Sequence, residues 1–293
     1  MSRSRARQIL APASGFLLFL QAALMVTGGA VRLTGSGLGC PTWPECTPGS
    51  YAPVLGQAEG LLHSWIEFGN RLLTFVLVAA ALVTLIAVLR AGRKDLRVLA
   101  AGQFLGIFAQ GILGGITVLV HLNPIAVSSH YLLTTILIAG ATSLYTRRKT
   151  PAQKKLSPIA AEIFSRAHIA LSAIVIVLGT VVTGAGPHAG DINAPRLHIR
   201  IQNAAQLHGS AVAILLILTI AFYLSPQVSA PTRKFLRFFF IASLAQGLIG
   251  IVQYLQGVPE LLVASHLAGS AIVWILAWRV WLTVQREEKV SVQ

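Results

Sequence analysis

Apolar runs of about the length of one membrane crossing recur along the whole chain. A helix needs ~20 residues to span a hydrocarbon core, and eight runs come close to that length. They lie at 12–33, 63–89, 98–120, 125–146, 165–185, 203–224, 234–255 and 260–284. The pattern therefore predicts an all-α integral membrane protein with eight transmembrane helices. The first run flows into further spans, which favours a retained helix over a cleaved signal peptide.

Composition and charge agree with a membrane protein. Of the 293 residues, 55% are apolar and 11% are charged, and the mean hydropathy is +0.72. The net charge of +14 could suggest a nucleic-acid partner, but the basic residues gather in alternate loops. They cluster at 3–7, 90–97, 147–155, 233–237 and 286–289, and the other loops hold few, chiefly Arg196 and Arg200. By the positive-inside rule this distribution predicts cytoplasmic termini and argues against nucleic acid.

Both cysteines of the chain lie in one turn-rich segment, "SGLGCPTWPEC" at 36–46. The predicted orientation places this loop outside, in an oxidising compartment, so we expect a disulfide between Cys40 and Cys46. So short a loop gains only modest entropic stabilisation, which leaves both a plain stabilising bridge and a chemical role open. Two cysteines with no histidine beside them supply too few ligands for a metal site.

An internal repeat organises the chain. "QGILGGITVLVHLNPIAVSSH" (110–130) and "QGLIGIVQYLQGVPELLVASH" (246–266) both run from Gln-Gly to Ser-His. Upstream, Thr27 pairs with Thr183 and Asn70 pairs with His208. We therefore predict two tandem pseudo-symmetric four-helix bundles, at 1–150 and 151–293, with an elaborated cysteine-bearing outer loop on the first.

Four histidines lie at or near the outer ends of predicted spans: His63, His130, His208 and His266. Imidazole within a bilayer is costly without a partner, so these residues are functional candidates. His208 and His266 can lie at one depth on facing helices, as axial ligation of haem iron requires. The alternative is that they only form hydrogen bonds within the bundle. We assign no site role to the histidines at span ends or in loops, which are His121, His168, His188 and His198.

Glu67 is the one acidic residue placed inside a predicted span, and Arg71 follows it at i+4. This spacing favours an ion pair on one helix face. The pair can be a buried structural contact. It can also hold a carboxylate near a reacting centre, where partial burial tunes its proton affinity.

These segments together resemble the haem A synthase family. "GGAVRLTGSGLGCPTWPEC" is similar to that family's first outer loop, "EFGNR" falls where the family has Glu-x-x-His-Arg, and the later histidines fall at its haem ligands. The resemblance covers nearly all eight spans. It implies a multi-pass enzyme of the bacterial cell (inner) membrane that oxidises the C8 methyl of haem O to a formyl group in two oxygen-dependent steps. The product would be haem A for terminal oxidases.

The resemblance also implies a site for each half. The second half would hold a haem b cofactor through His208 and His266. The first half would receive haem O near the catalytic Glu67, with His130 as an axial ligand of the substrate. The disulfide would lie above the substrate half in a redox or maturation role. Partners implied are molecular oxygen, membrane lipid, a haem O synthase and an electron donor, and the oligomeric state stays open.

One position departs from the family pattern: Asn70 stands where the first-half histidine is expected. We then expect His130 to be the only strong protein ligand for the substrate haem, with Asn70 facing that haem through a weakly ligating amide. The alternative is that Asn70 is a neutral packing replacement and that His63 supplies the second ligand. His63 lies seven positions earlier, about 10 Å away along a helix, and is a poor substitute.

Two other classes of protein fit part of the pattern. A di-haem b-type electron-transfer membrane protein would also use paired histidines. Repeated halves also occur in transporters, although the chain shows no broken helix at mid-membrane. The haem content of the purified protein would separate these classes from the synthase.

Overall fold

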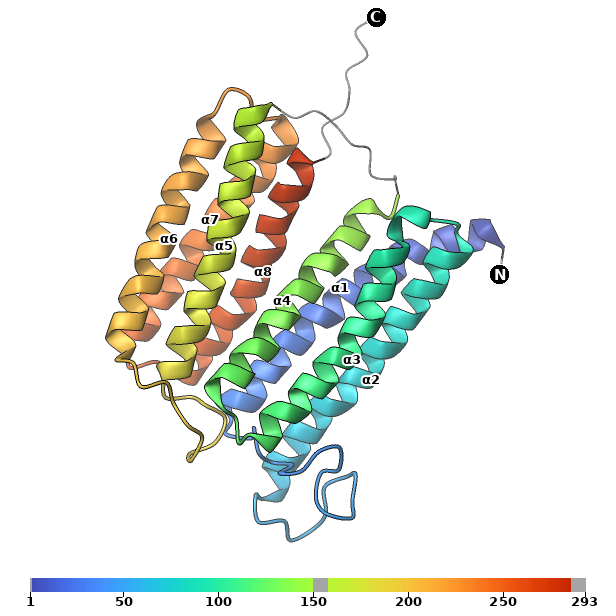
Figure 1. Cartoon of the computed structure of the whole chain (residues 1–293). Helices are drawn as coiled ribbons and strands as arrows, with labels where there is room; N and C mark the ends of the chain where they lie inside the picture. Colours follow the sequence, from blue (N-terminus) through green and yellow to red (C-terminus); the bar gives the residue numbers. More distant parts are fainter. Residues whose placement is uncertain (1, 150–157, 286–293) are drawn as a thin grey trace, which may run out of the picture. The chain divides into compact units, whose positions relative to one another are not determined.

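The computed structural model describes residues 2–149 and 158–285, and these ranges contain eight α-helices and no β-strand (Figure 1). The helices are α1 (Arg3–Leu33), α2 (Leu61–Arg90), α3 (Arg97–Leu119), α4 (Pro124–Arg147), α5 (Ile159–Ala185), α6 (Ile201–Leu224), α7 (Ala230–Leu255) and α8 (Glu260–Val284), with a short 3₁₀ turn η1 at Lys94–Leu96. All eight α-helices are long and apolar enough to cross a membrane. The predicted all-α membrane architecture is confirmed.

The helices extend beyond the apolar runs at their polar ends. α1 begins at Arg3, nine residues before the predicted start, because the Ser2 hydroxyl accepts a hydrogen bond from the Arg5 N–H and caps the helix. α7 begins at Ala230, after the capping residue Ser229. An apolar run in the sequence identifies only the part of a helix that can lie in the hydrocarbon core, not the full length of the helix. Capping side chains set the ends.

The chain divides into two compact units. The first comprises Met1–Arg148 with Thr180–Ile201, and the second comprises Lys149–Gly179 with Gln202–Gln293. The C-terminal end of α5 and the loop after it thus belong to the first unit. The predicted boundary at residue 150 lies outside the described residues, and the internal pseudo-symmetry stays a prediction.

In the first unit, α1 to α4 form a closed ring of neighbours. α1 packs against α2 and α4, and α3 packs against the same two helices. The buried side chains of this bundle include Leu17, Leu77, Ile107 and Leu144. Such a ring leaves side chains of all four helices facing one interior, where bundles place their cofactor sites.

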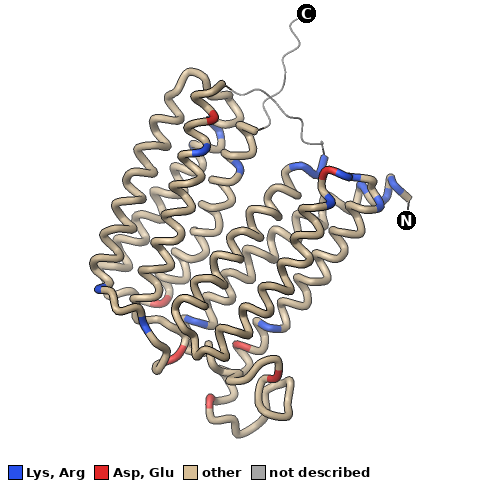
Figure 2. The backbone as a smooth tube through the Cα atoms, in the orientation of Figure 1, with Lys and Arg blue, Asp and Glu red and all other residues tan. Residues whose placement is uncertain are grey.

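Charged residues lie near the ends of the helices, and the middle stretches are almost free of them (Figure 2). Large apolar side chains such as Phe19, Phe75 and Ile136 are exposed on the helix surfaces. Lipid tails solvate such side chains as well as a protein interior does. A charged residue inside a span is therefore conspicuous, and the N-terminal end of α2 contains one, Glu67.

Candidate functional site

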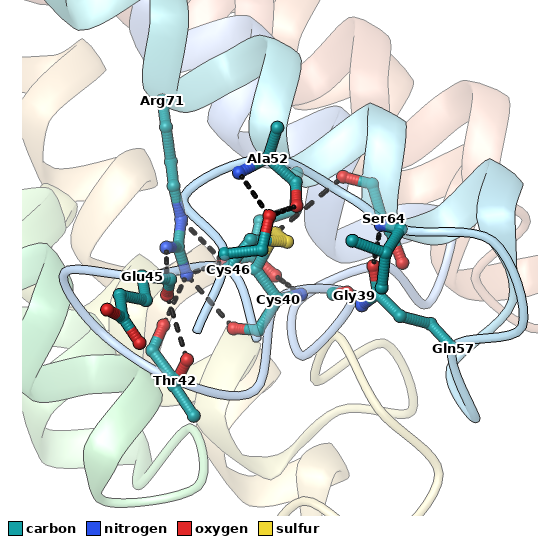
Figure 3. Close-up of a disulfide and its surroundings, with 12 residues drawn as sticks. Gly39, Cys40, Thr42, Glu45, Cys46, Ala52, Gln57, Ser64 and Arg71 are labelled. Carbon is teal, nitrogen blue, oxygen red and sulfur yellow. Dashed lines mark hydrogen bonds and ion pairs between the residues drawn. A yellow bond between two sulfur atoms is a disulfide. The ribbon is translucent and has the colours of Figure 1, made fainter. Parts of the chain in front are cut away.

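Cys40 and Cys46 form a disulfide in the loop that joins α1 to α2, as predicted (Figure 3). Both cysteines are fully buried. The loop turns back at Thr47 and Ser50, where the Cys46 N–H donates to the Ser50 carbonyl at 2.9 Å. This irregular segment therefore packs as a small closed structure between the C-terminal end of α1 and the N-terminal end of α2.

The predicted ion pair between Glu67 and Arg71 is present, with Arg71 Nη2 lying 2.6 Å from Glu67 Oε1. The other carboxylate oxygen, Oε2, accepts the Cys40 N–H at 2.7 Å. Arg71 also donates to the carbonyl oxygens of Cys40, Thr42 and Glu45 at 2.9, 3.1 and 3.2 Å (Figure 3). Both members of the pair thus attach the disulfide loop to α2.

Arg71 has this position because the loop has few backbone partners of its own. Buried carbonyl groups need donors, and a guanidinium offers five N–H donors in a fixed plane. One arginine can therefore replace several missing backbone hydrogen bonds. Glu67 is only 6% exposed, and its charge is compensated by Arg71 and by the Cys40 N–H.

Two glycines let the loop approach the helices closely. A Cβ atom added to Gly39 would lie 2.4 Å from the carbonyl oxygen of His63, at the start of α2. A Cβ atom on Gly115 of α3 would lie 2.3 Å from Cδ2 of Trp43. The loop is thus seated against α2 through its backbone and against α3 through Trp43.

Asn70 lies one turn further along α2 than Glu67, against α1. The Thr27 hydroxyl donates to Asn70 Oδ1 at 2.8 Å. A Cβ atom on Gly28 would lie 3.9 Å from Asn70 Nδ2. His63 has a different partner, because its Nδ1 lies 2.9 Å from the Ser36 hydroxyl in the first outer loop. Asn70 and His63 are therefore held by different elements, α1 and the loop between α1 and α2.

His130 lies in the second turn of α4 and packs on a glycine of α3. A Cβ atom on Gly114 would lie 3.1 Å from its Cε1. Its Nδ1 is buried and has no hydrogen-bond partner among the described residues. The backbone carbonyl of His130 accepts from Gln110 Nε2 at 3.0 Å, which ties this part of α4 to α3.

His208 of α6 and His266 of α8 face each other inside the second unit. Their ring centroids are 6.4 Å apart, and the ring planes make an angle of 74°. His208 Nδ1 lies 3.1 Å from the Val175 carbonyl of α5. Each ring packs on a glycine, Gly179 for His208 and Gly250 for His266, where an added Cβ would lie 3.4 Å from Cε1.

The sequence pairing of Thr27 with Thr183 is not repeated in the contacts. Thr27 bonds Asn70, whereas His208, the counterpart of Asn70, bonds a backbone carbonyl two turns before Thr183. The Thr183 carbonyl instead accepts a hydrogen bond from Arg32 at 2.6 Å. The repeat aligned Thr27 with Thr183, but it did not indicate the hydrogen-bond partner of either residue.

His168, which received no role from the sequence, is fully buried in α5. Its ring centroid lies 4.4 Å from that of Phe239, and neither ring nitrogen has a hydrogen-bond partner in the described ranges. Its placement at a span end was wrong, because α5 begins at Ile159 and His168 is nine residues inside it.

Residues 14–193 match the COX15-CtaA family of cytochrome oxidase assembly proteins. The chain belongs to this family. The matched stretch includes the disulfide loop, Glu67, Asn70 and His130, and ends before His208. Family membership thus bears directly on the first unit.

Two curated members named "Heme A synthase" are similar to this chain. The protein from Geobacillus thermodenitrificans is 29% identical over 103 residues, or 34% of this chain and 30% of that protein. The protein from Exiguobacterium sibiricum is 29% identical over 154 residues, or 47% of this chain and 50% of that protein. The chain thus spans half or less of the length of each relative.

Proposed function

We propose that this member of the family is a haem A synthase, an oxidoreductase that converts haem O to haem A for terminal oxidases. The reaction would oxidise the C8 methyl of haem O to a formyl group with molecular oxygen. The name of both relatives supports this reaction. The observation in the structure that carries the proposal is the facing pair of His208 and His266.

The spacing of these two rings fits a haem b between them. An imidazole nitrogen binds a metal at about 2 Å, and the ring centre lies roughly 1 Å further away. Two such ligands on opposite sides of one iron place their ring centres roughly 6 Å apart, and the observed value is 6.4 Å. The hydrogen bond at His208 Nδ1 also leaves Nε2 as the ligating atom, a typical arrangement for metal-bound histidine.

Haem b bound by His208 and His266 would supply electron transfer. The protein's part is to fix both rings. Val175 holds the tautomer of His208, and Gly179 and Gly250 leave no side chain between the rings and the neighbouring helix backbones.

In the first unit, His130 is the protein ligand proposed for the substrate haem. Its packing on Gly114 fixes the ring. Asn70 would face the same haem. Because Thr27 occupies its Oδ1, the NH₂ group of the amide remains as a donor toward what binds there. A carboxamide ligates iron weakly, so this face stays accessible to oxygen.

Glu67 has two proposed roles, a catalytic one and a positioning one. A catalytic role requires contact with the substrate, and that assignment stays a prediction. The contacts with Cys40 and Arg71 support a positioning role, because they hold the disulfide loop at the mouth of the first unit.

The di-haem cytochrome alternative is less well supported. A di-haem cytochrome needs two strong axial ligands in each unit, or four in all. Asn70 stands at one of these four positions, where a histidine would be needed. Family membership also favours oxidase assembly over simple electron transfer.

The chain is a multi-pass membrane protein of this family. We further propose that it lies in the bacterial inner membrane with cytoplasmic termini, receives haem O from a haem O synthase and draws electrons from a separate donor.

Haem extraction from the purified protein tests the proposed function. Haem b together with haem O or haem A is the expected result. Haem b alone would favour the electron-transfer alternative, and absence of any haem would reject both.

A further inference from the structure

Two arginines meet at the outer end of the first unit without an acidic partner. Arg32 lies in the last turn of α1, and Arg196 lies in the loop between α5 and α6. Both side chains contact the loop between α5 and α6, Arg32 at Gly190 and Arg196 at Pro187 and Ala194. No carboxylate of the described chain lies within 4 Å of either guanidinium group. Like charges held together in this way leave an uncompensated positive site.

The donors of Arg32 are largely unused. Its Nη2 donates to the Thr183 carbonyl at 2.6 Å, but its Nε is buried and lacks a partner within the described residues. Arg196 donates to two carbonyls of its own loop, those of Pro187 and Ala194. An arginine fork with free N–H groups is the preferred partner of a carboxylate or phosphate.

The nearest acidic residue in sequence does not neutralise the pair. Asp191 follows Gly190, whose added Cβ would lie 3.6 Å from Arg32 Cγ. Its Oδ1 instead accepts the Asn193 N–H at 2.7 Å. Interaction with the C-terminal dipole of α1 would stabilise Arg32 alone. It does not explain why a second arginine is held beside it.

The position of Arg32 connects this site to the one proposed for the substrate. Gly28 faces the Asn70 amide, and Arg32 follows Gly28 by four residues. Residues four apart lie on the same face of a helix, here about 6 Å further toward the outer end. Arg32 therefore stands above the Asn70 position, at the mouth of the bundle.

We infer that Arg32 and Arg196 bind the propionate carboxylates of the haem that enters the first unit. This inference rests on the proposed function, because it assigns the anion to the substrate haem. The two carboxylates project from one edge of the porphyrin. With that edge toward the mouth, the apolar remainder of the macrocycle lies among the helices. An anionic lipid headgroup has the same chemistry and is the competing occupant.

The test compares iron protoporphyrin IX with its dimethyl ester, which lacks both negative charges. Each compound is titrated by absorbance into the purified full chain with its second unit already loaded, in nanodiscs of phosphatidylcholine. The wild type should bind the acid about tenfold more tightly than the ester, or about 1.4 kcal/mol. Arg32→Gln and Arg196→Gln should each reduce this preference to about threefold or less.

Matched variants separate charge from folding. Arg32→Lys and Arg196→Lys keep the charge and should retain most of the preference. Arg200→Gln removes an exposed charge that follows the same loop and should leave the preference unchanged. The haem b spectrum of the second unit reports whether each variant has folded.

Four outcomes would overturn the inference. Equal binding of acid and ester by the wild type, with haem A still formed, rejects it and leaves the proposed function intact. A preference that survives both glutamine variants does the same. So does a preference that disappears when phosphatidylglycerol replaces phosphatidylcholine, because this identifies a lipid headgroup as the occupant. Failure of the wild type to bind either compound rejects the inference and the proposed function together.

Discussion

The hydroxyl of Thr27 holds the side-chain amide of Asn70 at 2.8 Å, across the interface of α1 and α2. Asn70 occupies the position where the resemblance leads one to expect a histidine. A polar contact here shows that the asparagine is a fixed part of the first unit. Its amide is oriented by a neighbouring helix.

Replacing Asn70 with His should add a second strong ligand in the first unit. With His130 opposite, we expect a six-coordinate low-spin substrate haem, readable by absorbance or electron paramagnetic resonance, and some retained activity. His130→Ala should abolish activity because no strong ligand remains. A high-spin spectrum in the Asn70→His protein would argue that the two positions do not share one haem.

His63→Ala should leave the substrate-haem spectrum unchanged. His63 is engaged by Ser36 in the first outer loop, so the substitution should affect that loop and not iron ligation. We expect a loss of about 1 kcal/mol in stability from the missing hydrogen bond. Loss of ligation while His130 is intact would show that His63 is the second ligand.

Replacing either His208 or His266 with Ala should remove or strongly perturb the low-spin haem b spectrum of the second unit. Each variant leaves one imidazole, and one ligand does not maintain a bis-histidine haem. His198→Ala, which changes an exposed loop histidine, is the control and should retain the spectrum. A normal spectrum in both site variants would contradict the ligand assignment.

Glu67→Gln should leave haem b bound and stop haem A formation. Because the carboxylate holds the Cys40 N–H and Arg71, the first unit should also lose about 1–3 kcal/mol of stability. The rate at which a reductant opens the disulfide separates the two proposed roles. Faster reduction in both Glu67→Gln and Arg71→Gln indicates positioning, whereas an unchanged rate together with lost activity indicates chemistry.

Gly39→Ala should displace the disulfide loop from α2. The new methyl would meet the carbonyl of His63 at 2.4 Å, and such overpacking costs about 1–3 kcal/mol. Gly102→Ala is the control, because nothing lies within 4 Å of its added Cβ; it should be neutral or stabilise α3 by up to about 1 kcal/mol. Protease sensitivity of the disulfide loop measures the effect of both substitutions. Equal sensitivity would show that the loop adapts to the added methyl.

Reporter fusions test the proposed orientation. Fusions after residues 50, 122, 192 and 258 should report the outer side, and those after 95, 152 and 230 the cytoplasm. Alternating clusters of Lys and Arg are the physical reason. One reversed pair would overturn the eight-span topology.

The sequence predicted the spans, the disulfide and the ion pair because each depends on local pattern. Apolar length, cysteine spacing and an i+4 pair can be read within one segment. The partners of Glu67 and Asn70 could not be read in this way. Cys40 lies 27 residues from Glu67, and Thr27 lies 43 residues from Asn70. Only packing brings them together.

His168 and Arg32 show a second limit. Apolar periodicity placed His168 near a span end, although α5 begins six residues before the predicted span. Arg32 lies at the end of the first predicted span, and nothing in its own segment indicated Arg196, 164 positions later. Long-range pairs of like charge have no sequence signature.

The hydrogen bonds from Arg71 to the carbonyl oxygens of the disulfide loop also imply an order of steps in the maturation of the protein. In the proposed orientation, α1 and α2 can insert while the loop is still reduced, but Cys40 and Cys46 can be joined only on the oxidising side. Until the loop closes, Arg71 lacks the backbone partners that complete its charge network. In a cell deficient in thiol oxidation, the chain would thus still insert all its spans, and the second unit, which has no cysteine, would still fold. The first unit would remain incomplete and unable to receive substrate.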